Sequence, residues 1–384
     1  MKILHLISSL DPTAGGVSQA LKTMINGTSA YDVKNEVISL DDPDAIFIKD
    51  SDFKVYSFGP GKTPWNYVEG LVSWLVSNLI TYEVVIVHGL WQFHTFAIYL
   101  ALKKLKVCTT RIYVMPHGML DPYFQKTSGR KLKAIRNWFF WKLVEKKIIA
   151  KADGLLFTCE SEMLLARQTF TPYSPNKEII VGLGVDEPPM FTDSMVMAFE
   201  KACHLRGRTY WVFLSRIHEK KGVDILIKAY LALSAKKKLP ALVIAGPGLE
   251  TLYGQSMLKL AQASPDIYFP GMLSGDAKWG AFYGCECFIL PSHQENFGIA
   301  VAEALACGKP VLISDQVNIY REIETSQAGI IFTDNELELH NAIEKFLTLD
   351  VDQLTAMKSS ARNLFEQRFC IKQTTQSLVM GISK

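Results

Sequence analysis

Short apolar runs rich in β-branched residues alternate with longer helical patterns along almost the whole chain of 384 residues. In the first half, strands are predicted at residues 2–7, 36–40, 54–58, 83–88, 111–115 and 155–159, and helices at residues 17–27, 67–80, 95–105, 131–151 and 161–169. Strands that alternate with helices indicate βαβ units and a parallel sheet. The first half therefore predicts a doubly wound α/β domain.

The second half repeats this architecture without repeating the sequence. Its strands are predicted at residues 210–214, 241–245, 267–269, 287–290, 311–314 and 330–332. The chain exceeds the roughly 250 to 300 residues at which one hydrophobic core usually stops growing. Residues 182–189 contain two glycines and two adjacent prolines, which suits a linker. We expect two Rossmann-like domains, at residues 1–187 and 208–367, with a linker at residues 188–207.

Composition excludes several classes of protein. The net charge of +3 is small and the basic residues are spread along the chain, so nucleic acid is not an expected partner. Seven cysteines without a CxxC pair argue against a disulfide framework or a zinc site and favour a reducing cytoplasm. His5 and the following Asp11-Pro12 make the first apolar run a strand, not a signal peptide. No window reaches the ~20 uninterrupted apolar residues of a membrane-spanning helix.

Ligands of open parallel sheets bind beyond the carboxyl ends of the strands, so the residues that follow each strand are the candidates. Gly15 and Gly16 follow the first strand and would let the loop approach a ligand closely. A GxGxxG fingerprint is absent at this turn, so a dehydrogenase that uses NAD is not expected. His88 and His117 lie at two further strand ends, where a histidine is often structural. We favour His117 for a role in catalysis.

A basic loop follows the first strand of the second half. Arg216 and Lys221 in this loop could clamp a diphosphate, because a guanidinium grips phosphate oxygens in pairs and an ammonium acts as a point charge. The alternative interpretation is a solvated basic turn.

The most informative segment leads from the strand at 287–290 into a predicted helix at 299–307. Residues 296–298 would offer backbone amides and the positive end of the helix dipole to phosphates, and Glu295 could accept hydrogen bonds from sugar hydroxyls. Glu303 lies in an alanine-rich part of the helix, and a carboxylate near apolar groups needs a partner. That partner is either the hydroxyl groups of a ligand or a nearby Arg or Lys.

Together these segments resemble glycosyltransferase family 4, the retaining enzymes of the GT-B fold. The resemblance spans nearly the whole chain and rests on Gly15-Gly16-Val17, Pro116-His117-Gly118-Met119, Gly184-Val185-Asp186, Ser215-Arg216 with Lys221-Gly222, Ala245-Gly246-Pro247-Gly248, and Glu295 with Glu303. It implies an N-terminal acceptor domain and a C-terminal donor domain that face a deep cleft. It also implies a C-terminal helix within residues 368–384 that crosses back to the first domain.

The resemblance further implies roles for single residues. Arg216 and Lys221 would bind the donor diphosphate, and Glu303 the ribose hydroxyls. The implied catalytic residues are His117, Arg216, Lys221 and Glu295, and the implied donor-binding residues are Gly15, Gly16, Arg216, Lys221, Gly246, Asn296, Phe297, Gly298 and Glu303.

The implied reaction is transfer of a hexose, with glucose from UDP-glucose as the leading donor, to a glycan or lipid-linked acceptor in polysaccharide or cell-envelope biosynthesis. No cofactor and no metal are expected. Asp350-Val351-Asp352 looks like the DxD element of metal-dependent transferases, but an aspartate that opens a helix is more often a cap. Asp41, Asp42 and Asp44 are interpreted as a surface turn.

Other functions compete with this reading. They are a nucleotide-sugar epimerase, a glycoside hydrolase with Glu295 and Glu303 as its two carboxyls, and a non-catalytic scaffold that binds sugar nucleotides. The predicted helix at 131–151 is rich in aromatic and basic residues. We expect its aromatics to be buried between neighbouring elements, with transient contact with the inner membrane surface as the alternative.

Overall fold

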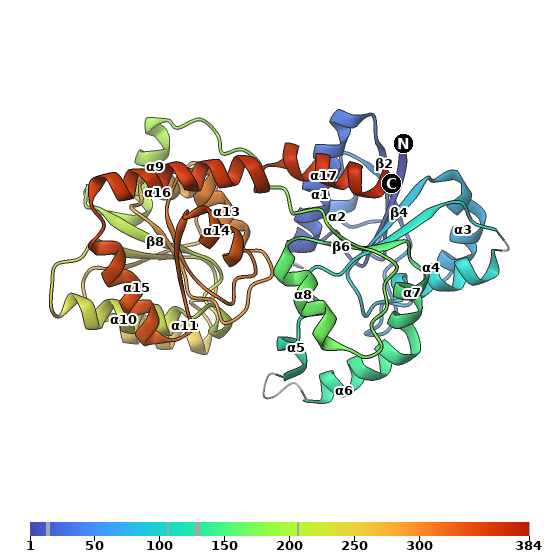
Figure 1. Cartoon of the computed structure of the whole chain (residues 1–384), viewed down its shortest axis with the longest axis horizontal. Coiled ribbons are helices and arrows are strands. Elements are labelled where there is room, and N and C mark those ends of the chain that lie inside the picture. The colour runs from blue at the N-terminus through green and yellow to red at the C-terminus, as the bar shows by residue number, and fades with distance from the viewer. Residues whose placement is uncertain (13–15, 106, 127–130, 206, 384) are drawn as a thin grey trace. The chain divides into compact units, whose positions relative to one another are not determined.

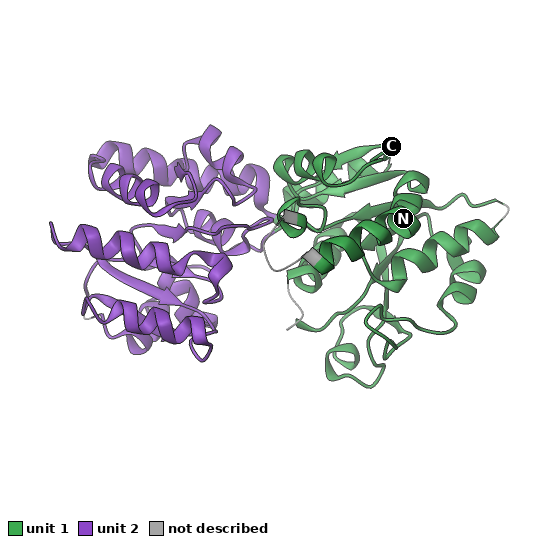
Figure 2. Cartoon of the chain, turned by 90° about the horizontal axis from the view of Figure 1, so that it is seen from below, with its two compact units in different colours: residues 1–184, 371–384 green, residues 185–370 purple. Residues whose placement is uncertain are grey.

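The computed structural model describes residues 1–12, 16–105, 107–126, 131–205 and 207–383. The chain divides into two compact units, which Figure 2 colours separately. Unit 1 consists of Met1–Gly184 and Ile371–Lys384, and unit 2 of Val185–Cys370. Each unit has its own parallel sheet with helices on both faces, so the predicted pair of Rossmann-like domains is confirmed (Figure 1).

Seven parallel strands form the sheet of unit 1 among the described residues, in the order β3-β2-β1-β4-β5-β6-β7. The strands are β1 (Lys2–Ile7), β2 (Lys34–Ser39), β3 (Lys54–Ser57), β4 (Val84–His88), β5 (Arg111–Met115), β6 (Gly154–Phe157) and β7 (Glu178–Ile180). The first six agree with the predicted strands to within two residues at each end. The short edge strand β7 was not predicted, because its three residues carry too few positions to show a pattern.

The helices of unit 1 are α1 (Gly16–Thr28), α2 (Ile46–Lys49), α3 (Leu71–Asn78), α4 (Phe93–Lys104), α5 (Tyr123–Lys126), α6 (Lys131–Phe140), α7 (Lys146–Lys151), α8 (Glu160–Thr169) and α17 (Ile371–Ser383). Alternate residues of β1 enter different cores. Leu4 and Leu6 pack with residues of α3 and α4, whereas Ile3 packs with Leu378 and Ile382 of α17. Strand periodicity thus sorts the apolar side chains between the two faces of the sheet.

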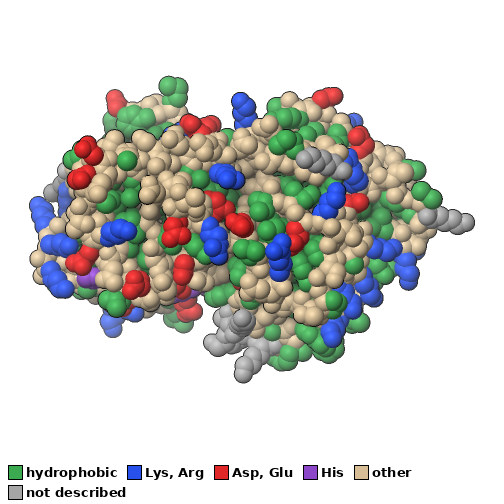
Figure 3. All heavy atoms as spheres, in the orientation of Figure 1, with side chains coloured by type: hydrophobic (Ala, Val, Ile, Leu, Met, Phe, Trp, Pro, Cys, Tyr) green, Lys and Arg blue, Asp and Glu red, His purple; other side chains and the backbone are tan. Residues whose placement is uncertain are grey.

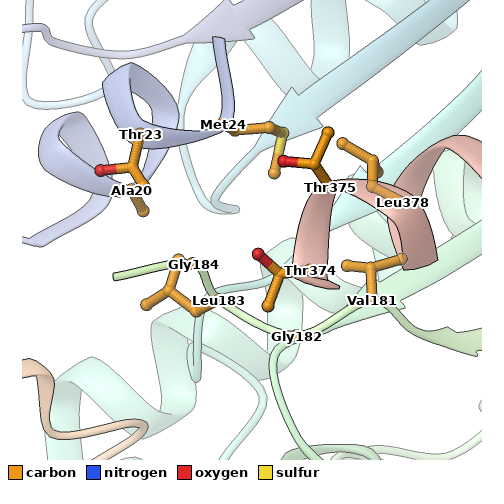
Figure 4. A pocket seen from close by; sticks show the side chains of 10 residues that line it. All are labelled: Ala20, Thr23, Met24, Val181, Gly182, Leu183, Gly184, Thr374, Thr375 and Leu378. Atoms are coloured by element: carbon orange, nitrogen blue, oxygen red, sulfur yellow. The ribbon is translucent and has the colours of Figure 1, made fainter. Parts of the chain in front are cut away.

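The last helix, α17, packs against α1 within unit 1. Glycine permits this close approach, because a Cβ on Gly27 would collide with Thr375 and a Cβ on Gly184 with Thr374. Figure 4 shows a small cavity lined by residues of α1, of α17 and of the 181–184 segment. The residues that line it carry no charge.

Unit 2 contains six parallel strands within its described residues, in the order β10-β9-β8-β11-β12-β13. They are β8 (Tyr210–Leu214), β9 (Ala241–Ala245), β10 (Ile267–Gly271), β11 (Phe288–Leu290), β12 (Val311–Ser314) and β13 (Gly329–Phe332). The helices are α9 (Asp193–Cys203), α10 (Val223–Ser234), α11 (Leu252–Ala261), α12 (Gly275–Gly284), α13 (Ile299–Ala306), α14 (Tyr320–Ser326), α15 (Glu336–Leu347) and α16 (Val351–Leu364). Helices α10, α11 and α15 cover one face of the sheet, and α9, α13, α14 and α16 the other (Figure 1).

The segment at 188–207 differs from the expected linker. It contains α9, whose Met195 and Phe199 are buried against α12. Gly280 of α12 permits this contact, because a Cβ there would meet the carbonyl oxygen of Met195. Residues 182–189, which are rich in glycine and proline, show no helical periodicity. The linker predicted from them was extended too far and included the amphipathic helix α9.

Two acidic segments also have clear structural roles. Asp350 caps α16, since its side chain accepts from the Gln353 amide while the Gln353 side chain accepts from the Asp350 amide, a capping box that agrees with the predicted cap. Asp41 is more than the surface turn expected from sequence. Its carboxylate accepts hydrogen bonds from Ser9 Oγ, the Leu10 amide and Ser39 Oγ at 2.6–2.8 Å, and so holds the end of β1 to the end of β2.

The predicted helix at 131–151 forms as α6, a π-helical turn at Trp141–Glu145 and α7. Trp141 is buried, as expected, but Trp138 and Phe139 are 45% and 52% exposed. The expectation that all these aromatics are buried is therefore wrong, because successive residues of a helix point to different sides and cannot share one buried face. No helix in the described part of the chain is long and apolar enough to cross a membrane.

Candidate functional site

Three loops of unit 2 meet at the carboxyl edge of its sheet. They follow β8, β9 and β11, and glycines bring them together. A Cβ on Gly222 would collide with the carbonyl of Pro291, and a Cβ on Gly246 with the carbonyl of Ser215. Both glycines have positive φ, at +66° and +146°. Gly246, which was predicted to bind the donor, therefore allows the β9 loop to pack directly against the loop that carries Arg216.

Lys221 and Glu295, from two of these loops, form an ion pair. Their side chains are 8% and 23% exposed, so the charges are largely removed from water. The backbone of Glu295 is fixed as well, because its amide donates to the Gln316 carbonyl and its carbonyl accepts from the Asn318 amide, at 2.9 and 3.0 Å. Sequence reasoning placed both residues at the donor site but did not pair them.

Arg216 is exposed and, among the described residues, no carboxylate pairs with its guanidinium. The neighbouring Ile217 amide donates to the Pro247 carbonyl at 2.8 Å, which ties the Arg216 loop to the β9 loop. The five donors of this side chain are thus available to an anion.

The loop after β11 ends at the start of α13. Gly298 is the N-cap residue, with φ +80°, and within the described part of the chain no side-chain cap is present at this helix. Phe297 is buried and packs edge-on against Phe369, with ring centroids 5.4 Å apart, which anchors the loop from beneath. Asn296 accepts from the Asn318 side chain at 3.3 Å. An uncapped helix N-terminus at this edge suits an anionic ligand.

Glu303, in the second turn of α13, pairs with Lys278 of α12, and the Nζ to Oε1 distance is 2.5 Å. Burial raises the pKa of Glu303, the Lys278 ammonium opposes this rise, and Asp186 adds to it. The alternative interpretation of Glu303, a pair with a nearby lysine, therefore describes its state in this structure. Glu303 is 9% exposed as a whole residue, so it keeps limited contact with the surface.

Two groups at this edge were missed from sequence. One is Lys278, which lies 25 residues before its partner on another helix. The other is His293, whose Nδ1 lies 2.7 Å from the Asp334 carboxylate, while its amide donates to the Lys220 carbonyl. The Asp334 contact raises the pKa of His293. His293 stands in the loop that follows β11, a signal that could have identified it, whereas no local signal points to Lys278.

In unit 1, His117 follows β5 in a turn with φ +52°, and the adjacent Gly118 amide donates to Glu162 Oε1 at 2.5 Å. His117 Nε2 lies 3.0 Å from His88 Nδ1, and His88 Nε2 lies 3.0 Å from His5 Nδ1. Burial lowers the pKa of His117 and of His5 to about 4. His88 and His117, which sequence reasoning considered separately, thus belong to one line of hydrogen bonds.

Of the two glycines predicted in the first loop, the structure describes only Gly16. Gly16 is exposed and starts α1, with open space where a Cβ would stand. Gly15 lies outside the described residues. The predicted approach of this loop to the donor phosphates stays a prediction.

The family model and the curated relatives that match this chain are described as glycosyltransferases. Residues 199–364 match the family described as glycosyl transferases group 1. A D-inositol 3-phosphate glycosyltransferase of Stackebrandtia nassauensis is 26% identical over 220 residues, which cover 53% of this chain and 48% of the relative. The chain thus aligns with about half the length of the curated relatives it matches.

Solved structures extend the likeness to the whole fold. A glycosyltransferase from Rickettsia africae has a TM-score of 0.76 at 15% identity, with 100% of this chain and 97% of that chain covered. The Anabaena protein Alr3699/HepE, solved in complex with UDP, has a TM-score of 0.75 at 18% identity, with both chains fully covered at 100%. These likenesses confirm the GT-B fold class expected from sequence.

Proposed function

We propose that this chain, whose residues 199–364 match the group 1 glycosyltransferases, is a member of that family and transfers a hexose from a nucleotide diphosphate sugar to a glycan or lipid-linked acceptor. UDP-glucose is the donor that we propose first, because the Anabaena protein of similar fold was solved with UDP-glucose. The observation that carries the proposal is the convergence of Arg216, Lys221, Glu295 and the start of α13 at one edge of the unit 2 sheet.

The chemistry of this edge fits a sugar nucleotide. Arg216, whose guanidinium has no carboxylate partner among the described residues, would bind the diphosphate, and the start of α13 offers backbone amides. Glu303 and Glu295 supply carboxylate oxygens for ribose and sugar hydroxyls, and each already has a lysine beside it. The Lys278 ammonium opposes the effect of burial on the pKa of Glu303, which favours the charged form that accepts hydrogen bonds.

We also propose that the reaction retains the anomeric configuration and needs no metal. The acceptor hydroxyl oxygen forms a bond to the anomeric carbon on the face from which the diphosphate leaves. The bond from that carbon to the diphosphate oxygen breaks, and a diphosphate oxygen takes the hydroxyl proton. Arg216, Lys221 and the helix amides would stabilise the charge on the departing diphosphate, a preorganised role of the kind that is worth about 3 kcal/mol for one donor.

Calorimetric titration tests the donor site. UDP, GDP and ADP are titrated into the purified protein with EDTA present, and into the Glu303→Gln variant. We expect selective UDP binding that EDTA leaves unchanged and that Glu303→Gln weakens about tenfold, the effect of one hydrogen bond to a charged group. The matched control is Glu344→Gln, because Glu344 is a half-exposed carboxylate of the same unit.

The outcomes separate the competing functions. If no nucleotide binds, the donor-site proposal is overturned. If GDP binds in place of UDP, the site stands and the proposed base is wrong. Binding with release of an epimerised sugar nucleotide in the absence of acceptor would identify an epimerase, whereas binding without turnover over a broad acceptor panel would indicate a scaffold.

A surface on α6 and the following π turn supports a lipid-linked acceptor. Five apolar side chains there are 45–84% exposed, namely Leu132, Ile135, Trp138, Phe139 and Leu143. Lys133, Arg136 and Lys142 are exposed among them, and Figure 3 shows basic and hydrophobic side chains side by side along this edge of unit 1. Such a surface combines apolar insertion with attraction to anionic lipid headgroups.

Vesicle sedimentation tests this contact. We expect the protein to bind vesicles that contain phosphatidylglycerol more strongly than vesicles of phosphatidylcholine alone. The double variant Leu132→Ser with Phe139→Ser should lose most of this binding. Leu252→Ser is the control, because Leu252 is 93% exposed and lies in unit 2. Equal binding by wild type and the double variant would refute a membrane role for this surface.

A further inference from the structure

A continuous line of hydrogen bonds runs through the core of unit 1 and ends at His117. It starts at Thr28 near the end of α1, passes through Asn35 of β2 and His5 of β1, and continues through His88 of β4. The successive distances are 2.8 Å from Asn35 Nδ2 to Thr28 Oγ1, 3.0 Å from His5 Nε2 to Asn35 Oδ1, and 3.0 Å for each of the two contacts between histidines. Three neighbouring strands thus contribute to one polar line.

The direction of this line is set at its buried end. The Thr28 hydroxyl donates its single proton to the Met24 and Ile25 carbonyls, at 2.9 and 3.0 Å. Thr28 Oγ1 can therefore only accept from Asn35, which must present Nδ2 to Thr28 and Oδ1 to His5. Because Oδ1 is an acceptor, the proton of neutral His5 lies on Nε2.

The same logic passes along the histidines. With its proton on Nε2, His5 offers a bare Nδ1, so His88 must donate from its own Nε2. His88 then offers a bare Nδ1, and His117 must donate from Nε2. All three rings are neutral at pH 7, because burial lowers the pKa of each. The last nitrogen, Nδ1 of His117, is left with a lone pair at the carboxyl edge of the sheet.

We propose that Asn35 and His5 are positioning residues that hold His117 in the tautomer with a bare Nδ1, which accepts a hydrogen bond from a hydroxyl group of an acceptor sugar bound to unit 1. The contact with sugar rests on the proposed function, whereas the order of the protons does not. His117 suits this role because its ring is only partly buried, in contrast to His5 and His88. A histidine free to change tautomer would spend part of its time presenting an N–H to the same hydroxyl, and it would then compete as a donor.

The structure offers a matched pair of variants at the start of the line. Asn35→Leu keeps the approximate size of the side chain and removes the acceptor for His5. Asn35→Asp keeps an acceptor oxygen at the same position. Only Asn35→Leu should allow His5 to adopt either tautomer. Both variants remove the amide group that donates to Thr28.

Nitrogen NMR of the protein labelled with ¹⁵N in its histidine rings tests the order directly. Signals are assigned with His5→Gln, His88→Gln and His117→Gln, one at a time. In the wild type at pH 7 we expect His117 to carry its proton on Nε2 and to have a bare Nδ1. Asn35→Leu should give a mixture of both His117 tautomers, and Asn35→Asp should keep the wild-type pattern. A proton on His117 Nδ1 in the wild type, or a pattern that Asn35→Leu leaves unchanged, would overturn the proposal.

Transfer kinetics test the use of the bare nitrogen. With UDP-glucose, we expect Asn35→Leu to lower kcat about fivefold, the effect of one ordinary hydrogen bond, and Asn35→Asp to restore most of it. Affinity for UDP alone should not change, because the proposed nucleotide site lies in unit 2. Equal kcat in Asn35→Leu and wild type would refute the contact with sugar. If the protein shows the expected NMR pattern but transfers no sugar, the proposed order of the protons stands and only the proposed function is overturned.

Discussion

At the scale of single residues, the unit 2 site consists of carboxylates that already have lysine partners. Glu295 pairs with Lys221 and Glu303 with Lys278, and all four side chains are at most 24% exposed. Part-buried charges of this kind are stable only as pairs, because each alone would carry a desolvation cost without compensation. A ligand that binds here must therefore exchange hydrogen bonds with groups that are already satisfied, which favours a polyhydroxylated, anionic molecule over an apolar one.

The Lys278 and Glu303 pair gives a measurable coupling. We expect Lys278→Met to raise the pKa of Glu303 further, because the ammonium that opposes the effect of burial is lost. A double-mutant cycle with Glu303→Gln, measured by urea unfolding of unit 2 at pH 7, should give a coupling free energy of about 1 to 2 kcal/mol. A coupling near zero would show that the pair does not contribute to stability.

A second residue-scale prediction concerns Gly246. Gly246→Ala should weaken UDP binding at least about tenfold, because the new Cβ would push the β9 loop away from Ser215 and Arg216. Gly275→Ala is the control: Gly275 also has a positive φ, at +52°, but has open space around it. Gly275→Ala places a side chain at a left-handed φ, at a backbone cost of about 1 to 2 kcal/mol, but without a collision. Equal UDP affinity in the two variants would contradict the assigned role of Gly246.

At the scale of elements, helix ends separate structural acidic residues from functional ones. The α16 helix begins with a reciprocal capping box, whereas α13 begins with a glycine and, as far as the described residues go, with no side-chain cap. The first arrangement satisfies its own backbone amides and leaves nothing for a ligand. The second leaves its amides to an external acceptor.

This difference predicts the effect of Asp350→Ala. We expect a loss of about 1 kcal/mol in the free energy of unfolding and no change in the rate of sugar transfer, because the carboxylate only caps α16. Urea midpoints and transfer rates measured on the same preparation check both parts. A loss of transfer of a hundredfold or more, with a requirement for added divalent metal, would instead support the metal-dependent DxD interpretation.

At the scale of the whole molecule, the two units should respond to acid differently. In unit 1, burial lowers the pKa of His5, His94 and His117 to about 4 and of His88 well below its usual value. The unfolded chain takes up protons near the ordinary pKa of about 6.5, before the folded unit does. The contribution of these histidines to stability is therefore complete above that value and is lost as the pH falls.

When the pH falls from 7 to 5, each independent histidine of this kind lowers the free energy of unfolding by about 2 kcal/mol. One carboxyl acts in the opposite direction, because burial raises the pKa of Glu145 to about 7, and the folded unit then gains a proton over the same range. The gain from Glu145 is also about 2 kcal/mol, so it offsets one histidine of the four. The net expectation is that acid destabilises unit 1.

In unit 2, the pKa of His293 is raised by Asp334, so its contribution is complete below the ordinary pKa and is lost as the pH rises. Hydrogen exchange followed by mass spectrometry measures the two units separately. From pH 7 to pH 5, after correction for the intrinsic exchange rate, we expect protection of β1, β4 and β5 to fall more than protection of β8, β11 and β12. Equal changes in both sheets would show that the buried histidines do not govern the acid response.

Much of the fold follows from local pattern. Strand periodicity and helix signals depend on sterics between near neighbours, so they placed β1, β5, β8, β9 and β12 at their observed bounds. They did not reveal α9 in the expected linker or the π turn within 131–151, where packing against distant residues decides the local conformation. The C-terminal helix was expected from a family resemblance, and its packing on α1 depends on glycines whose neighbours are distant in sequence.

The sequence by itself determined which residues stand after strands, and hence the candidates Arg216, Lys221, Glu295 and His117. Only the tertiary structure decided the partners: Glu295 for Lys221, Lys278 for Glu303, and for His117 a line of hydrogen bonds through His88 and His5 that starts at Thr28. The physical reason is distance along the chain. Residues adjacent in sequence leave a pattern because their geometry is fixed by the backbone, whereas residues tens of positions apart meet only when crossovers bring their strands and helices together.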